Sequence, residues 1–82
     1  MQTTTLIETT SCLYLKRLVR ELNAQPGGFY APVAAGFNVR CNRARLKGET
    51  LQCHSFGSPE WFTPGANSFS DSYGREIVAS RR

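Results

Sequence analysis

The chain lacks the motifs that most often identify an enzyme. It contains no G-x-S-x-G, P-loop or G-x-G-x-x-G sequence, which excludes the common serine nucleophile and the glycine-rich phosphate loops. Its single histidine, His54, directly follows Cys53, and neighbouring residues of a strand point to opposite faces, so they do not form a nucleophile–base pair. The six acidic residues are scattered along the chain and form no recognisable pair. We therefore expect a non-enzymatic protein.

Signals for disulfides, cofactors and membrane insertion are also missing. Three cysteines are an odd number, and no signal-peptide pattern precedes them, so the sequence predicts reduced thiols and a cytoplasmic location. Cys41, Cys53 and His54 lie close together in the hairpin predicted below, but Cys53 and His54 point to opposite faces and cannot share one metal ion. We expect no metal, no other cofactor and no small-molecule substrate. The longest apolar run, 30–37, is interrupted and too short to span a bilayer, so no membrane partner is expected.

Size and charge define the broad class. The 82 residues form one small domain, 1–82, in which 1–9 and the basic end 81–82 are expected to be mobile. Ten Lys and Arg residues face six acidic ones, a net charge of +4 that favours an anionic partner.

One amphipathic helix is predicted from Ser11 to Ala24. Apolar residues recur at helical spacing and form one stripe: Leu15, Leu18, Val19 and Leu22. The opposite arc carries the cations Lys16, Arg17 and Arg20. The segment 25–28 then ends the helix, because it combines proline with two glycines.

The threonine-rich start allows two alternatives. Residues 2–7 suit a short strand, whereas Thr5 and Glu8 have the spacing of a helix capping box. We favour an extended or frayed start before the helix.

A β-hairpin is predicted over 37–55, with a two-residue turn at Lys47-Gly48. Cys41 and Ala44 both resemble core residues although three positions separate them, and side chains alternate strictly along a strand. One face holds both only if an extra residue, a β-bulge, lies near Asn42. The turn pairs Ala44 with Leu51, and the bulge then places Cys41 opposite Cys53.

The bulged hairpin has two distinct faces. The core face holds Val39, Cys41, Ala44, Leu46, Leu51 and Cys53. The other face is polar and cationic and holds Arg40, Arg43, Arg45, Thr50, Gln52 and His54.

The remaining chain completes an α+β fold. Residues 29–36 form an apolar connector, 63–66 suit a type II turn, and 71–74 suit a type I turn with Gly74 in a bulge. Strands are expected near 60–63, 67–71 and 75–80. The prediction is one N-terminal amphipathic helix packed on a small antiparallel meander sheet of four to five strands. Trp61, Phe62 and Phe69 are expected in the core, with Leu13 and Tyr73 exposed.

The strongest functional signal is the cation cluster of the hairpin. Four of the ten Lys and Arg residues fall within 40–47, and no acidic residue lies between Glu21 and Glu49. Arginine suits two-point contacts with phosphate, and a β-ribbon can lie along a nucleic-acid backbone. The predicted nucleic-acid-binding residues are Arg40, Asn42, Arg43, Arg45, Lys47, Gln52 and His54, extended by Lys16, Arg17 and Arg20 of the helix.

Two functional hypotheses follow. The first is a small accessory regulator of the kind that phages and plasmids encode. It contacts the DNA backbone and, like a co-repressor, stabilises a partner DNA-binding protein on the DNA. DNA is favoured over RNA. The second is a small protein inhibitor of the anti-defence type, anchored by apolar residues such as Leu13, Tyr30 or Phe56.

Overall fold

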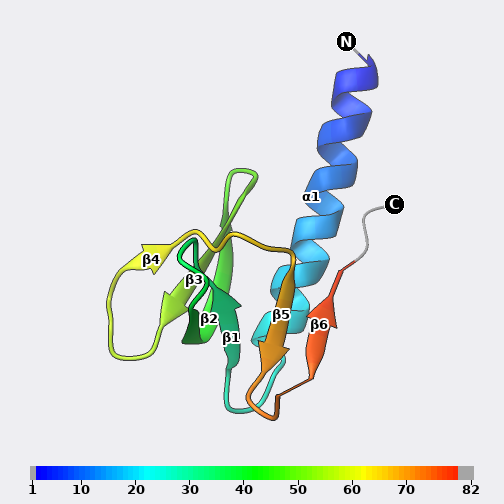
Figure 1. Ribbon diagram of the computed structural model, residues 1–82. Helices are drawn as coiled ribbons and strands as arrows, with labels where there is room; N and C mark the ends of the chain where they lie inside the picture. Colours follow the sequence, from blue (N-terminus) through cyan, green and yellow to red (C-terminus); the bar gives the residue numbers. More distant parts are fainter. Residues whose placement is uncertain (1, 80–82) are drawn as a thin grey trace.

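The computed structural model describes the backbone of residues 2–79 and the side chains from Leu13 onward. Its elements are α1 (Gln2–Asn23), β1 (Phe29–Pro32), β2 (Asn38–Lys47), β3 (Thr50–Ser55), β4 (Trp61–Phe62), β5 (Ser68–Asp71) and β6 (Glu76–Val78) (Figure 1). All neighbouring strands are antiparallel, and they form one six-stranded sheet in the order β4-β3-β2-β1-β5-β6. The predicted α+β class is confirmed, although the sheet has six strands and not four to five.

The predicted apolar connector contains a central strand. Phe29–Pro32 is β1, which pairs with β2 on one side and β5 on the other, with Phe29 opposite both Cys41 and Asp71. Phe29 and Ala31 are fully buried, while Tyr30 and Pro32 are half-buried, which is the alternation of a strand. Pro32 is tolerated because its backbone faces away from β2, with its carbonyl accepting from the Gly65 N–H, and β5 pairs with β1 only at Phe29 and Tyr30. Since β1 separates β2 from β5, the sheet is not the predicted meander.

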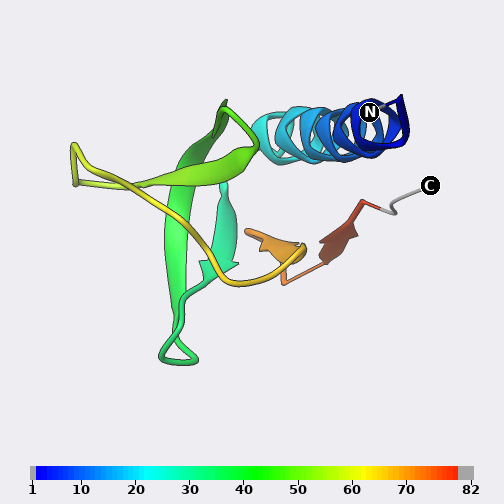
Figure 2. The ribbon, with the colours of Figure 1, turned by 90° about the horizontal axis from the view of Figure 1, so that it is seen from above.

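The segment 63–67 crosses the molecule and does not turn back on itself. It joins β4, at one edge of the sheet, to β5, which lies beyond β1 (Figures 1 and 2). Gly65 lacks the positive φ that a type II turn requires, so that prediction is wrong. The 71–74 turn is as predicted: the Gly74 N–H donates to the Asp71 carbonyl at 3.1 Å, and Gly74 has φ of 82°.

The hairpin of β2 and β3 turns one residue later than predicted, at Gly48-Glu49. Gly48 has φ of 66°, as the first position of a type II′ turn requires. The observed partner of Leu46 is Leu51, and that of Ala44 is Cys53, so the predicted pairing was displaced by two residues. A slip of two leaves every side chain on its face, whereas a slip of one would have exchanged the faces.

The helix begins at Gln2, well before the predicted start, and ends at Asn23, one residue from the predicted end. The expected extended start is wrong: no proline or glycine precedes Pro26, so nothing in this part of the chain forces a helix to stop. Residue 1 and the predicted mobile end 81–82 lie outside the described residues.

The core lies between α1 and one face of the sheet (Figure 2). Leu18 and Leu22 of the predicted stripe are fully buried, Leu15 and Val19 are half-buried, and Tyr14 joins them. These side chains meet the inner residues of the strands, namely Phe29, Ala31, Cys41, Ala44, Leu51, Cys53 and Phe69.

An asparagine ties the end of α1 to the sheet. The Asn23 side chain donates Nδ2–H to the Ala44 carbonyl at 3.1 Å and accepts the Ala44 N–H at 2.7 Å. Along a hairpin, pairs of residues that exchange backbone hydrogen bonds alternate with pairs that do not, and counting from the turn Ala44 and Cys53 form a pair that does not. The backbone N–H and carbonyl of Ala44 therefore point away from β3. β1 pairs with β2 only as far as Cys41, so the Asn23 amide supplies the missing partner.

Gly28 is a position where added volume would be costly. A Cβ there would lie 2.4 Å from the Cys41 carbonyl oxygen and 2.9 Å from the Phe56 ring, and Gly28 has φ of +83°. We expect Gly28→Ala to lower the free energy of unfolding by about 2–5 kcal/mol, from the left-handed backbone (about 1–2) and overpacking (about 1–3) together. Urea denaturation followed by circular dichroism measures the loss.

Gly36→Ala is the matched control. Gly36 has nearly the same φ, +84°, but nothing lies within 4 Å of its added Cβ. Only the backbone term applies, so the expected loss is about 1–2 kcal/mol. Equal losses in the two variants would contradict the close approach at Gly28.

The ionised Asp71 carboxylate stabilises the turn between β5 and β6, and we expect this stabilisation to be lost in acid. The Arg75 backbone N–H, at 2.9 Å from Oδ1, holds the pKa of buried Asp71 below its ordinary value, and the Tyr73 N–H and the Arg75 guanidinium act in the same direction. A lowered pKa means stabilisation that is present above the ordinary pKa of 3.8 and lost as the pH falls through the folded-state value. Wild type should therefore exceed Asp71→Asn in unfolding free energy at pH 6, and the difference should shrink below about pH 4. A pH-independent difference would count against this role.

Candidate nucleic-acid interface

The bulge in β2 determines which side chains face away from the core. The pairing of β2 with β3 shifts between Cys41 and Arg43, so Asn42 is the extra residue, as predicted. Cys41 and Ala44 are consequently both buried, although three positions separate them. Asn42 and Arg43, between them, are both exposed on the other side.

We call this other side of β2, β3 and β4 the basic face. Its members are Arg40, Asn42, Arg43, Arg45, Lys47, Gln52, His54 and Trp61. The pairing places Arg43 beside His54, Arg45 beside Gln52 and Lys47 beside Thr50. The structure thus brings all seven predicted hairpin residues together, on the side of the sheet that α1 does not cover.

Among the described residues, no carboxylate pairs with the cations of the basic face. Arg43 and Lys47 are exposed and have no hydrogen bond or ion pair with any described residue. The ion pairs found within the described part of the chain, Arg17–Glu21 and Arg75–Asp71, both lie elsewhere. The positive charge of this face therefore remains available to an external anion.

Two of the arginines are held in place by neutral groups. Arg45 donates Nε–H to Gln52 Oε1 at 3.0 Å and lies 4.1 Å above the Trp61 ring. Arg40 donates to the Gly27 carbonyl at 3.2 Å and lies 4.5 Å above the Phe56 ring. These contacts orient the guanidinium groups and leave their charge in place, which lowers the entropy cost of binding.

Trp61 belongs to the basic face and not to the core. β4 pairs Trp61 with His54 and Phe62 with Cys53, so only Phe62 packs against the core. The prediction of Trp61 as core is wrong because neighbouring strand residues cannot share a face. The sequence alone could have shown this, because Trp61 and Phe62 are adjacent in a predicted strand and only one of them can face the core.

A hollow of about 210 Å³ opens on the basic face, lined by Asn42, Arg43, His54 and Trp61. The His54 and Trp61 rings are 5.0 Å apart between centroids and inclined at 57°. Asn42 Oδ1 lies 2.9 Å from His54 Nδ1, which fixes the imidazole against its neighbour. The lining of the hollow therefore contains two aromatic rings and a guanidinium with no described partner.

The helix cations do not extend this face. α1 buries its apolar stripe against the core side of the sheet, so exposed Lys16, Arg17 and Arg20 lie on the other side of the sheet from the basic face (Figure 2). Arg17 is also paired with Glu21 at 3.3 Å. These three predicted site residues are not brought together with the other seven.

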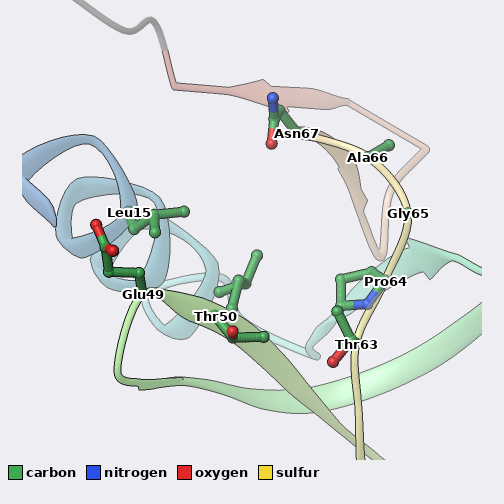
Figure 3. Close-up of a pocket in the computed structure, with 9 residues that line it drawn as sticks. Leu15, Glu49, Thr50, Thr63, Pro64, Gly65, Ala66 and Asn67 are labelled. Atoms are coloured by element: carbon green, nitrogen blue, oxygen red, sulfur yellow. The ribbon is translucent and has the colours of Figure 1, made fainter. Parts of the chain in front are cut away.

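A second hollow, of about 320 Å³, suits an anion less well. It lies between α1, the tip of the hairpin and the 63–67 segment (Figure 3). Its lining includes the carboxylate of Glu49 and no cation.

The two buried thiols differ in acidity. Cys41 and Cys53 are free and fully buried, and Cys41 Sγ lies 3.3 Å from the Val39 carbonyl. A hydrogen bond between the two thiols, with Cys53 as the donor, lowers the pKa of Cys41 and, together with burial, raises the pKa of Cys53. His54 projects from the opposite face, and no group of three potential metal ligands occurs among the described side chains.

Comparisons with known proteins add no assignment. No family model, no curated protein and no solved structure matches this chain. Within residues 2–79, no helix has both the length and the apolar content needed to cross a bilayer.

The basic face should be dispensable for folding. We expect the double change Arg43→Ala and Arg45→Ala to cost no more than about 1.5 kcal/mol of unfolding free energy, because Arg43 has no described partner and Arg45 loses only exposed contacts. Urea denaturation of the double variant measures this. Loss of the folded state would show that these arginines are structural.

Proposed function

We propose that the protein is a non-enzymatic accessory factor whose basic face binds the backbone of nucleic acid, with DNA favoured over RNA. The observation that supports it best is the row Arg43, Arg45 and Lys47, three cations on one face of β2 with no described carboxylate partner. An exposed sheet face needs polar residues, but it does not need three cations in a row without acids between them.

The spacing of this row suits a polyanion. Alternate residues of a strand are separated by roughly 7 Å, so three of them span roughly 14 Å. One nucleic-acid strand carries a phosphate about every 3.4 Å along its axis, so the row covers about four nucleotides. Arg40 would add one contact beyond the bulge. About three or four phosphate contacts give weak binding that does not depend on sequence.

Weak backbone contact is most useful beside a second DNA-binding protein. If this chain also touches a regulator bound to the same DNA, the two contacts act at a high effective concentration and each stabilises the other. The proposal is therefore co-repressor-like action in a reducing cytoplasm, where Cys41 and Cys53 stay free as thiols.

A second candidate function is inhibition of another protein by direct binding. Leu13 and Phe56 are 62% and 45% exposed, so both could serve as apolar anchors, whereas Tyr30 is half-buried in β1. Leu13 lies on α1 and Phe56 lies beneath Arg40, so the two do not form one apolar patch.

Salt dependence tests the backbone proposal. A fluorescent random-sequence duplex, titrated at several salt concentrations, should give a log–log slope of about −3 to −4, from roughly −0.9 per phosphate contacted. Changing Arg43 and Arg45 together to Ala should make the slope shallower by about 1.8 and weaken binding to all sequences equally.

The double change Lys16→Ala and Arg20→Ala is the control, because it removes the same charge from the other side of the sheet. It should leave the slope nearly unchanged. Equal effects of the two double variants would mean that net charge matters and the basic face does not. A flat wild-type slope, or no binding near 50 mM salt, would end the proposal.

A further inference from the structure

Trp61 lies outside the hydrophobic core. It is half-buried on the exposed side of a two-residue edge strand, and the residue that packs inward from that strand is Phe62. Around Trp61 lie a guanidinium, an imidazole and an amide, those of Arg45, His54 and Asn42. A large aromatic ring in a polar, cationic setting is what a ligand with both a flat ring and a negative charge requires.

The hollow beside Trp61 offers the groups that one nucleotide needs. His54 and Trp61 line the hollow, and since Arg45 already lies over the Trp61 ring, a base can stack only on the aromatic surface that borders the hollow. Arg43, which also lines the hollow, has no described partner and can hold the adjoining phosphate. Asn42 uses Oδ1 on His54, which leaves its amide N–H groups free to donate to the edge of a base.

We infer that this hollow binds one unpaired base, so that the basic face prefers single-stranded to double-stranded nucleic acid. The inference rests on the proposed function and narrows its substrate class. At about 210 Å³ the hollow is smaller than the roughly 300 Å³ at which pockets for drug-sized ligands begin, which suits one ring system and not a whole cofactor. In a duplex the faces of the bases are covered by their neighbours, so only an unpaired base can stack on Trp61.

Trp61 is the chain's only tryptophan, so its fluorescence reports directly on the hollow. The wild-type protein is titrated with three DNAs of equal length: a single-stranded oligothymidylate, an abasic strand with the same phosphates, and a duplex. We expect the oligothymidylate to quench Trp61 and to bind about 5- to 100-fold tighter than the abasic strand, the usual effect of stacking one base. The duplex should bind no tighter than the abasic strand.

Variants, in which binding is followed by the anisotropy of the same three DNAs carrying a fluorescent label, then assign the preference to the ring. Trp61→Leu should reduce the preference for the oligothymidylate over the abasic strand to less than about twofold, while salt-dependent binding to the abasic strand remains. Trp61→Phe keeps an aromatic ring and should retain most of the preference. Tyr73→Leu is the matched control, because Tyr73 is 68% exposed and lies under Arg75 at 5.4 Å, outside the basic face. It should bind all three DNAs as wild type does.

The outcomes separate this inference from the proposed function. Equal, salt-dependent binding of the oligothymidylate and the abasic strand would overturn the inference and leave backbone binding intact. Tighter binding of the duplex than of the oligothymidylate would do the same. Failure of all three DNAs to bind near 50 mM salt would overturn both.

Discussion

The β-bulge at Asn42 decides which side chains of β2 enter the core and which join the basic face. Without the extra residue, Cys41 and Ala44 would point to opposite sides of the sheet, and one of two buried residues would be exposed. The bulge keeps both in the core. It also places Asn42 and Arg43 together on the outer side, where they line the hollow beside Trp61.

The helix is fixed close to this irregularity. β1 pairs with β2 only up to Cys41, and the freed backbone groups of Ala44 are taken by Asn23 at the end of α1. The helix is thereby held on the core side of the sheet, where Leu18 and Leu22 are buried. The consequence for function is that no element in the described chain covers the basic face.

The basic face combines charge with aromatic surface. Arg45 stacks on Trp61 and Arg40 on Phe56, so each cation is oriented by a neutral ring and not by a carboxylate. A carboxylate would have cancelled the charge, whereas a ring leaves it available to phosphate. This combination supports the proposed binding of a nucleic-acid backbone, and the hollow beside Trp61 supports the narrower proposal of an unpaired base.

The local patterns of the fold follow from the sequence alone. Helical spacing identified the stripe through Leu18 and Leu22, strand alternation required the bulge, and the 71–74 turn followed from Asp71 and Gly74. The faces of the hairpin survived a pairing error because the error was two residues, and alternation has a period of two. The hairpin cations were therefore assigned to the correct face of the hairpin, although their predicted cross-strand partners were wrong.

The pairing of distant segments is a property of the whole fold. Phe29–Pro32 became a central strand because Phe29 lies between Cys41 and Asp71, residues 12 and 42 positions away, and no local pattern records such a choice. The same pairing sent the 63–67 segment across the molecule and left β4 at the edge, with Trp61 turned outward. Hydrogen bonds between strands are made by backbone groups that every residue carries, so the sequence marks the faces of a strand far more clearly than its neighbours.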